Sequence, residues 1–167
     1  YLLTQQQKDG SWFGRWGMNY IYGTWSALCA LNAAGLAREH EAMRRAVSWL
    51  THIQNRDGGW GEAGESYNLE HTEHIPAPST PSQTAWALLG LMAAGETQTP
   101  PVARGIAFLM ANLGRDGAWR EEQFTATGFP RVFYLRYHGY AQYFPLWALA
   151  RYRNLRQAQG SPTRWGM

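Results

Sequence analysis

The stretch QNRDGGW, from Gln54 to Trp60, decides the fold of this chain because it occurs more than once. QQKDGSW precedes it at Gln6–Trp12, and LGRDGAW follows it, more loosely, at Leu113–Trp119. Each copy has a basic residue, then Asp-Gly, one small residue and Trp. Asp-Gly favours a tight turn, because Gly accepts positive φ and Asp hydrogen-bonds its own local backbone. A turn that recurs in this way predicts a repeat architecture.

Apolar segments rich in Ala and Leu alternate with these turns. TWSALCALNAAG begins at Thr24, TAWALLGLMAAG at Thr84 and FPLWALARY at Phe144, so successive segments begin 60 residues apart. A helix that is apolar on all sides is a buried one. We therefore predict three buried inner helices.

Two segments of another kind separate the apolar ones. EHEAMRRAVSWLTHI (Glu39 to Ile53) and PPVARGIAFLMANL (Pro100 to Leu113) carry an apolar stripe at helical spacing, which is typical of amphipathic helices. The alternation predicts an all-α fold that forms part of an α/α barrel, with about three inner and three outer helices. No segment alternates with period two, so strands should be minor.

Composition narrows the class further. Aromatic residues make up 14% of the 167 residues and include nine Trp, while charged residues make up only 16%, against about 25% in ordinary domains. The net charge of +3 is modest and the Arg residues are scattered along the chain, which does not support a nucleic-acid partner. The single Cys29 excludes an internal disulfide, and no apolar run reaches the roughly 18 residues of a membrane span. The opening YLLTQQQKDG is typical of the end of a helix in a longer polypeptide.

At this point the motifs resemble those of a family. Q-x-x-x-G-x-W at Gln6–Trp12 and Gln54–Trp60 resembles the QW motif of triterpene cyclases. FGRWGMNYIYGTW, GGWGE, STPSQTAWAL and TGFPRVFYLRYHGYAQYFP resemble the C-terminal part of bacterial squalene–hopene cyclases, in the same order. The resemblance implies that residues 1–167 are the C-terminal half of a terpene cyclase α/α-barrel domain. It also implies that the structural QW residues are Gln6, Trp12, Gln54, Trp60 and Trp119. The third copy departs, with Leu113 at the Gln position, which should weaken its cap.

The resemblance implies a reaction through carbocations. In this family an acidic Asp protonates squalene, the rings close in turn, and water or a base ends the cascade at hopanol or hopene, without metal or organic cofactor. Aromatic faces stabilise a cation by about 0.5–2 kcal/mol each without trapping it as a nucleophile would. TGFPRVFYLRYHGYAQYFP, which is dense in rings and has no acid, suits such a wall. The pocket residues implied by the motifs are Trp16, Tyr22, Phe129, Phe133, Tyr137 and Tyr140.

The protonating group of the family belongs to a DxDD motif, which this sequence lacks. Its three Asp, at positions 9, 57 and 116, all lie in the Asp-Gly turns, so we expect no catalytic residue in the chain and no activity from it alone. The resemblance implies an isomerase, squalene as substrate and the rest of the barrel as partner, with a homo-oligomer as a further option. It implies peripheral attachment of the full-length enzyme to the cytoplasmic membrane face, and we expect the fragment to be soluble.

Other notable residues have structural interpretations. We expect core packing for Trp25, Trp86, Trp147 and Cys29, packing for Phe124 and Tyr134, and bonds to carbonyls or partner helices for Arg15 and Arg136. Glu62 should make local backbone contacts. The run EHTEH at Glu70–His74 lacks a four-ligand set, so a surface loop is favoured there over a metal site.

Three alternatives stay open. A bacterial copalyl-type diterpene cyclase would need cationic phosphate contacts, for which Arg131 and Arg136 are candidates. An α/α-barrel glycoside hydrolase requires two facing carboxylates, and the adjacent Glu121 and Glu122 point apart. A non-catalytic α/α repeat scaffold would bind a partner on its inner surface.

Overall fold

The computed structural model describes residues 1–68 and 73–158, and the predicted all-α class is confirmed. Six α-helices and a short 3-10 helix account for most of the described chain, and one two-stranded antiparallel sheet accompanies them. The elements are α1 (Leu2–Gln5), α2 (Asn19–Ala33), α3 (Glu41–His52), η1 (Gly64–Tyr67), α4 (Pro81–Ala93), α5 (Pro100–Ala111), β1 (Ala126–Phe129), β2 (Phe133–Leu135) and α6 (Tyr140–Gln157).

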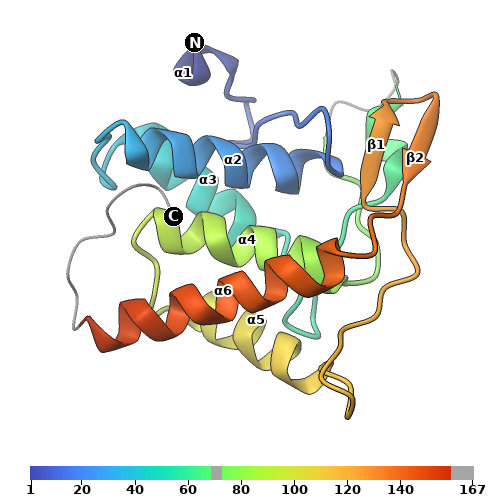
Figure 1. Cartoon of the computed structure of the whole chain (residues 1–167). Helices are drawn as coiled ribbons and strands as arrows, with labels where there is room; N and C mark the ends of the chain where they lie inside the picture. Colours follow the sequence, from blue (N-terminus) through green and yellow to red (C-terminus); the bar gives the residue numbers. More distant parts are fainter. Residues whose placement is uncertain (69–72, 159–167) are drawn as a thin grey trace.

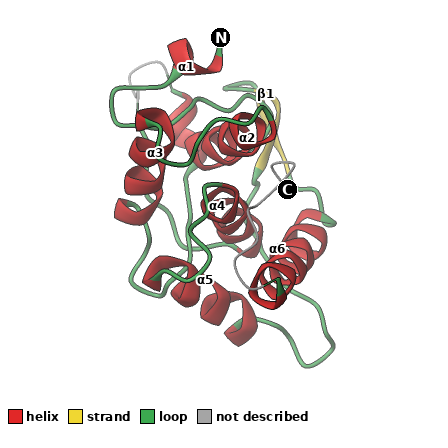
Figure 2. Ribbon diagram, turned by 90° about the vertical axis from the view of Figure 1, so that its left-hand side faces the viewer, coloured by secondary structure: helices red, strands yellow, loops and turns green. Residues whose placement is uncertain are grey.

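The helices form two layers. The inner helices α2, α4 and α6 run side by side in the same direction, with α4 between the other two (Figure 1). Viewed along these helices, α3 and α5 lie together on one side of them (Figure 2). This alternation of inner and outer helices is the predicted α/α repeat.

The middle inner helix, α4, is the core of the chain. All thirteen of its residues are buried, as predicted for a helix without a polar face. The Thr80 side chain caps it by accepting a hydrogen bond from the backbone N–H of Gln83, and Pro81 stands at its first position, where a missing N–H costs nothing. It ends before Gly95, whose φ of +87° suits glycine.

Each Asp-Gly turn is bonded to the helix that precedes it. The indole N–H groups of Trp12, Trp60 and Trp119 each donate, at 2.8 Å, to the carbonyl oxygen ten residues earlier. For Trp60 this acceptor is Leu50, in the last turn of α3, where a helix has carbonyls without an internal partner. The backbone N–H of Trp60 donates to Thr84 Oγ1 at 2.9 Å, which also ties the turn to α4.

The Gln of the motif bonds the next outer helix. Gln54 Nε2 donates to the carbonyl oxygen of Gly58 within the turn at 2.7 Å and to that of Pro101 in α5 at 2.9 Å. Gln6 makes the equivalent pair of bonds, to Gly10 at 2.9 Å and to Ala42 in α3 at 2.8 Å. The first two turns therefore connect three helices each. In the third turn Leu113 has no amide with which to do so.

The structure fixes the limits of the elements and corrects one expectation, namely that all three inner helices are buried on all sides. The inner helices begin at Asn19, Pro81 and Tyr140, which is three to five residues before the apolar segments begin. TGFPRVFYL forms the β1–β2 hairpin, and Arg131 at its tip has a φ of +68°. The inner helix α6 is not buried all round, because no described element covers its far side.

Exposed fractions make the point about α6. Tyr143 is 72% exposed and Leu146 is 63% exposed, and only Ala141, Pro145 and Ala148 of this helix are buried. Phe124, expected to pack, is also 55% exposed, beneath the guanidinium of Arg136.

Candidate functional site

The six rings implied by the motifs all lie at one end of the inner helices. Trp16 precedes α2, Tyr22 is its fourth residue, Phe129 and Phe133 belong to the hairpin, and Tyr137 and Tyr140 lead into α6. This is the end at which α2, α4 and α6 all begin, next to the hairpin (Figure 1). The expected location, at one mouth of the helical array, therefore agrees with their place in the fold.

The loop that carries Trp16 is joined to the hairpin. Met18 N donates to the Thr125 carbonyl at 3.0 Å, and Thr127 N donates to the Trp16 carbonyl at 3.1 Å. Gly17 forms an isolated antiparallel bridge with Ala126, so this loop pairs with the beginning of β1. Long-range backbone pairing thus brings the loop of Trp16 next to the hairpin of Phe129 and Phe133.

The side chain of Tyr67, in η1, is hydrogen-bonded to the same loop. Its hydroxyl oxygen lies 2.6 Å from the carbonyl oxygen of Gly14 and 2.5 Å from that of Gly17, to which it donates. Its ring stacks on Tyr134 of β2 at a centroid distance of 6.3 Å. Burial raises the pKa of Tyr67, so the hydroxyl keeps the proton that it donates.

Three of the six rings belong to one continuous aromatic cluster. The Tyr22 ring lies edge-on to Trp86, at 5.1 Å between centroids. Trp86 in turn contacts Tyr140 at 5.8 Å, and Tyr140 contacts Tyr137 at 4.9 Å. Burial raises the pKa of both Tyr22 and Tyr140, so these rings remain neutral phenols. Helices α2, α4 and α6 each contribute to this cluster.

The other three rings are arranged differently. Phe129 and Phe133 form an edge-to-face pair at 5.8 Å on the hairpin, and the Arg15 guanidinium lies over Trp16 at 5.1 Å. All three rings are about half exposed, at 45–54%. The structure thus places the six rings as a group of three, a pair and a single ring.

Sequence reasoning missed the centre of the cluster. Trp86 was expected only to fill the core, yet this fully buried ring contacts Tyr22, Trp25, Tyr140 and Phe144, and so connects all three inner helices. The 60-residue spacing predicted its burial. It could not predict which rings would meet there.

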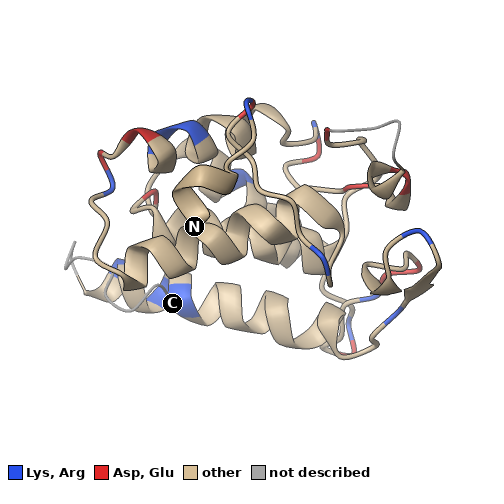
Figure 3. Cartoon of the chain, turned by 90° about the horizontal axis from the view of Figure 1, so that it is seen from above, with Lys and Arg blue, Asp and Glu red and all other residues tan. Residues whose placement is uncertain are grey.

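The parts of α2, α4 and α6 that form the cluster carry no charged residue, but two carboxyl groups lie next to the beginnings of α2 and α4. Helix α4 has no charged residue, and α6 has none before Arg151 (Figure 3). Glu62 and Glu121 instead follow the turns and bond the first turns of α2 and α4. Glu62 was expected to make local contacts. Its partners lie 41 to 43 residues earlier.

The environment of Glu62 is strongly desolvated. Burial raises the pKa of its carboxyl group, while His74 and three backbone N–H donors oppose part of that rise. Burial likewise raises the pKa of Glu121, and hydrogen bonds from Ser82 oppose the rise.

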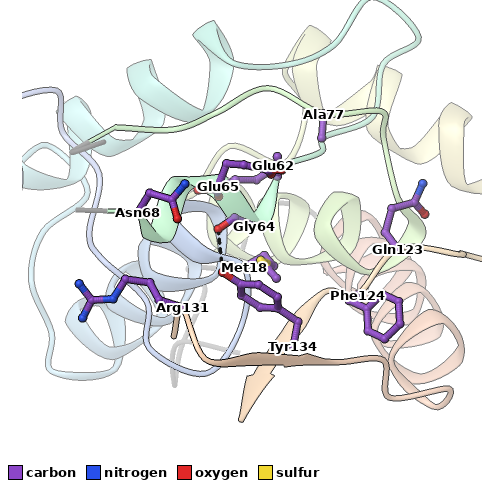
Figure 4. Close-up of a pocket in the computed structure, with 11 residues that line it drawn as sticks. Met18, Glu62, Gly64, Glu65, Asn68, Ala77, Gln123, Phe124, Arg131 and Tyr134 are labelled. Carbon is purple, nitrogen blue, oxygen red and sulfur yellow. Dashed lines mark hydrogen bonds between the residues drawn. The ribbon is translucent and has the colours of Figure 1, made fainter. Parts of the chain in front are cut away.

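A cavity of about 600 Å³ lies between η1 and the hairpin (Figure 4). Met18, Phe124 and Tyr134 line it, and so do Glu62 and Arg131. The Tyr134 hydroxyl reaches across to donate to the Gly64 carbonyl at 3.2 Å. None of the six rings lines this cavity.

The three Asp all serve their turns. In each case Oδ1 accepts a hydrogen bond from the backbone N–H two residues later, at Ser11, Gly59 and Ala118. Hydrogen bonds from Arg120 and from the backbone N–H of Ala118 lower the pKa of Asp116 below its usual value. These exposed turn carboxylates lack the burial that would hold a proton on an acid catalyst.

Two negative findings apply to the described residues. Within 1–68 and 73–158, no three His, Cys, Asp or Glu side chains are arranged to hold a metal ion. Part of EHTEH, from Glu70 to Thr72, lies outside the described residues. Among the described helices, none has both the length and the apolar character needed to cross a bilayer.

The fold and the aromatic cluster together define the class of this protein. It is an α/α repeat domain whose inner helices bring aromatic rings together near the end at which they begin. Comparison with known proteins narrows this class. Residues 1–154 match the family described as the squalene-hopene cyclase C-terminal domain, and the chain belongs to that family.

Curated relatives agree over nearly the whole chain. The squalene–hopene cyclase of Zymomonas mobilis is 60% identical over 167 residues, which are 100% of this chain and 25% of the relative. That of Bradyrhizobium diazoefficiens has the same identity and coverage. A probable squalene–hopene cyclase of Sinorhizobium fredii is 64% identical over 93% of this chain and 24% of the relative. The chain therefore spans about a quarter of the length of these relatives.

Proposed function

We propose that this chain is the C-terminal part of a squalene–hopene cyclase, in which it lines the cavity where squalene closes to hopene or hopanol through carbocations. The observation that carries the proposal is the continuous aromatic cluster from Tyr137 through Tyr140 and Trp86 to Tyr22. The family to which the chain belongs supports it.

The chemistry of the wall fits a travelling cation. A ring face attracts a cation by about 0.5–2 kcal/mol, and more where water is excluded. Neutral Tyr and Phe rings do this without supplying an ionised group that would end the cascade early. In this proposal Phe129 and Phe133 stabilise later cations. The tyrosines Tyr22, Tyr137 and Tyr140 shape the cavity and support its acid end, and Trp16 lines it.

The remaining parts of the proposal concern the complete enzyme. The protonating acid comes from another part of the enzyme, because the three Asp described above occupy turns. Squalene is the substrate, the rest of the barrel is the partner, and the enzyme attaches peripherally to the cytoplasmic face of the membrane. The exposed face of α6, with Tyr143 and Leu146, suits a contact with the rest of the barrel or a second copy.

The bonding of the carboxyl groups of Glu62 and Glu121 weighs against the glycoside hydrolase alternative. That reaction needs two carboxyl groups on either side of a glycosidic bond. Glu62 and Glu121 both accept hydrogen bonds from helix N-termini instead.

A chimera tests the proposal. This chain replaces the aligned 167 residues of the Zymomonas mobilis relative, and the products from squalene are separated by gas chromatography. We expect hopene or hopanol from the chimera, none from the 167-residue chain alone, and incompletely cyclised products from the Phe133→Ala chimera. Phe124→Ala, which removes a ring of comparable exposure outside the six, is the matched control and should keep the parental products. An inactive chimera that is folded, or cyclisation by the chain alone, would contradict the proposal.

A further inference from the structure

The carboxyl group of Glu62 is fully occupied by the first turn of α2. Oε1 accepts a hydrogen bond from the backbone N–H of Tyr20 at 3.1 Å. Oε2 accepts from those of Asn19 at 3.1 Å and Ile21 at 2.9 Å. A helix leaves its first N–H groups without an internal partner, and Met18, which precedes α2, has no side chain that caps them. Glu62 therefore supplies the cap from a distant part of the chain.

Glu62 is itself fixed by the next inner helix. Its backbone N–H donates to Gln83 Oε1 at 3.2 Å, and Gln83 Nε2 donates back to the Glu62 carbonyl at 3.1 Å. Gln83 is 1% exposed and lies in the first turn of α4. Glu62 thus links the beginnings of α2 and α4 through buried hydrogen bonds, with its carboxyl group bonded to α2 and its backbone bonded to Gln83 of α4.

The following turn repeats this arrangement. Glu121 follows Trp119 by two residues, as Glu62 follows Trp60. Its carboxylate accepts from Ser82 N at 3.1 Å and Ser82 Oγ at 3.0 Å, at the beginning of α4. In both cases the Glu bonds the inner helix that precedes its own turn. An arrangement that occurs twice is a regular feature of the fold.

The first turn of α2 leads directly into the aromatic cluster. Tyr22 follows Ile21, and its ring stands edge-on to Trp25 at 5.3 Å and to Trp86 at 5.1 Å. Fraying of this turn would move Tyr22 relative to Trp86, which is fixed in the buried α4. The position of the Tyr22 ring therefore depends on the cap.

We propose that Glu62 is a positioning residue of the aromatic cluster. It caps the first turn of α2 from the segment that follows Trp60, and it thereby fixes the position of the Tyr22 ring. The consequence for cyclisation rests on the proposed function. A carboxyl group is required because both of its oxygens accept, whereas Gln has one acceptor and would turn an N–H₂ group toward an N–H donor.

The first test measures the geometry in the 167-residue chain. Amide hydrogen exchange is followed by NMR in Glu62→Gln, Glu121→Gln and Glu122→Gln. Glu122 is the control because it is exposed and makes its hydrogen bonds to Gln123 and Arg136 through its backbone. In Glu62→Gln, protection at residues 19–21 should fall about tenfold, with shifted Tyr22 ring signals and no change at Ser82. Glu121→Gln should lower the protection of Ser82 and leave residues 19–21 unchanged. Glu122→Gln should change the protection of neither segment. Unchanged protection at residues 19–21 in Glu62→Gln overturns the proposal.

The second test measures the effect on the reaction in the chimera described above. Glu62→Gln should lower kcat for squalene about tenfold and raise the share of incompletely cyclised products, with KM changed less than about twofold. Glu62→Asp, which keeps the carboxyl group but is one methylene shorter, should be intermediate in both tests and serves if Glu62→Gln does not fold. A product pattern and kcat equal to those of Glu122→Gln overturn the proposal. Should the parent chimera be inactive, the proposed function fails, while the exchange experiment still decides the role of Glu62.

Discussion

The connection between one turn and the next outer helix can be tested by giving the second turn the residue of the third. Gln54→Leu introduces at position 54 the side chain that stands at Leu113. It removes the bonds from Nε2 to the carbonyl oxygens of Gly58 at 2.7 Å and Pro101 at 2.9 Å. It also removes the acceptor of Arg104, a contact at the exposed edge of the turn.

The expected loss follows from these contacts. Each of the two bonds is worth about 1 kcal/mol net. The Pro101 carbonyl lies inside α5, where the helix also offers it an N–H donor, so the substitution does not leave it unpaired. The exposed Arg104 contact adds little. We therefore expect the free energy of unfolding to fall by about 2 kcal/mol, or the melting temperature by about 4–8 °C.

Urea unfolding of the 167-residue chain, followed by tryptophan fluorescence, measures this difference. Gln98→Leu, an exposed Gln in the loop before α5, is the matched control and should stay within about 0.5 kcal/mol of the parent chain. The reverse substitution Leu113→Gln can gain only the bond inside its own turn, so it should stabilise by at most about 1 kcal/mol.

The reasoning fails if Gln54→Leu is no less stable than Gln98→Leu. It also fails if Leu113→Gln gains as much as Gln54→Leu loses, because the turn alone, and not the next outer helix, would then account for the effect.

Three further outcomes are expected from urea titrations of the same chain. Gly105→Ala should destabilise by about 1–2 kcal/mol, because a Cβ there would lie 2.7 Å from the Trp60 ring and 2.8 Å from Leu88; equal or higher stability would mean that the contact relaxes freely. Arg131→Gly should stabilise by about 0.5–1 kcal/mol, since Gly tolerates the φ of +68° at the hairpin tip; a loss would show that the Arg side chain makes a compensating contact. Burial raises the folded-state pKa of Glu62, so its favourable contribution is complete below its unfolded pKa and is lost as the pH rises through the folded pKa. Relative to Glu62→Gln, the parent chain should thus lose stability as the pH rises from about 4, and a difference that does not vary with pH would contradict the raised pKa.

Much of the repeat could be predicted because its signals are local. The Asp of each Asp-Gly turn accepts a hydrogen bond from the backbone N–H two residues later, as Asp57 does from Gly59. The apolar composition of α4 likewise predicted burial without knowledge of any partner.

The beginning of α2 could not be predicted in the same way. Asn19 begins α2 because Glu62, 43 residues away, caps its N–H group. An apolar pattern starting at Thr24 carries no sign of that distant cap.

The candidate site was also only partly predictable from the sequence. Motifs selected six rings, and the fold places all of them at one end of the inner helices. Their contacts depend on Trp86, which the sequence marked only as a core residue. The hairpin pairing that brings Trp16 near Phe129 joins segments more than 100 residues apart, as the bond from Thr127 Oγ1 to the Arg15 carbonyl shows.

The sequence by itself determined the Asp-Gly turns, the all-α class and the apolar character of the inner helices, because each of these depends on neighbouring residues and on composition. Only the tertiary structure decided that Glu62 caps α2, that Trp86 joins the rings of three helices and that one face of α6 stays exposed. Such contacts depend on which helices pack together, and a side chain's bonding capacity does not specify a partner that lies more than 40 residues away.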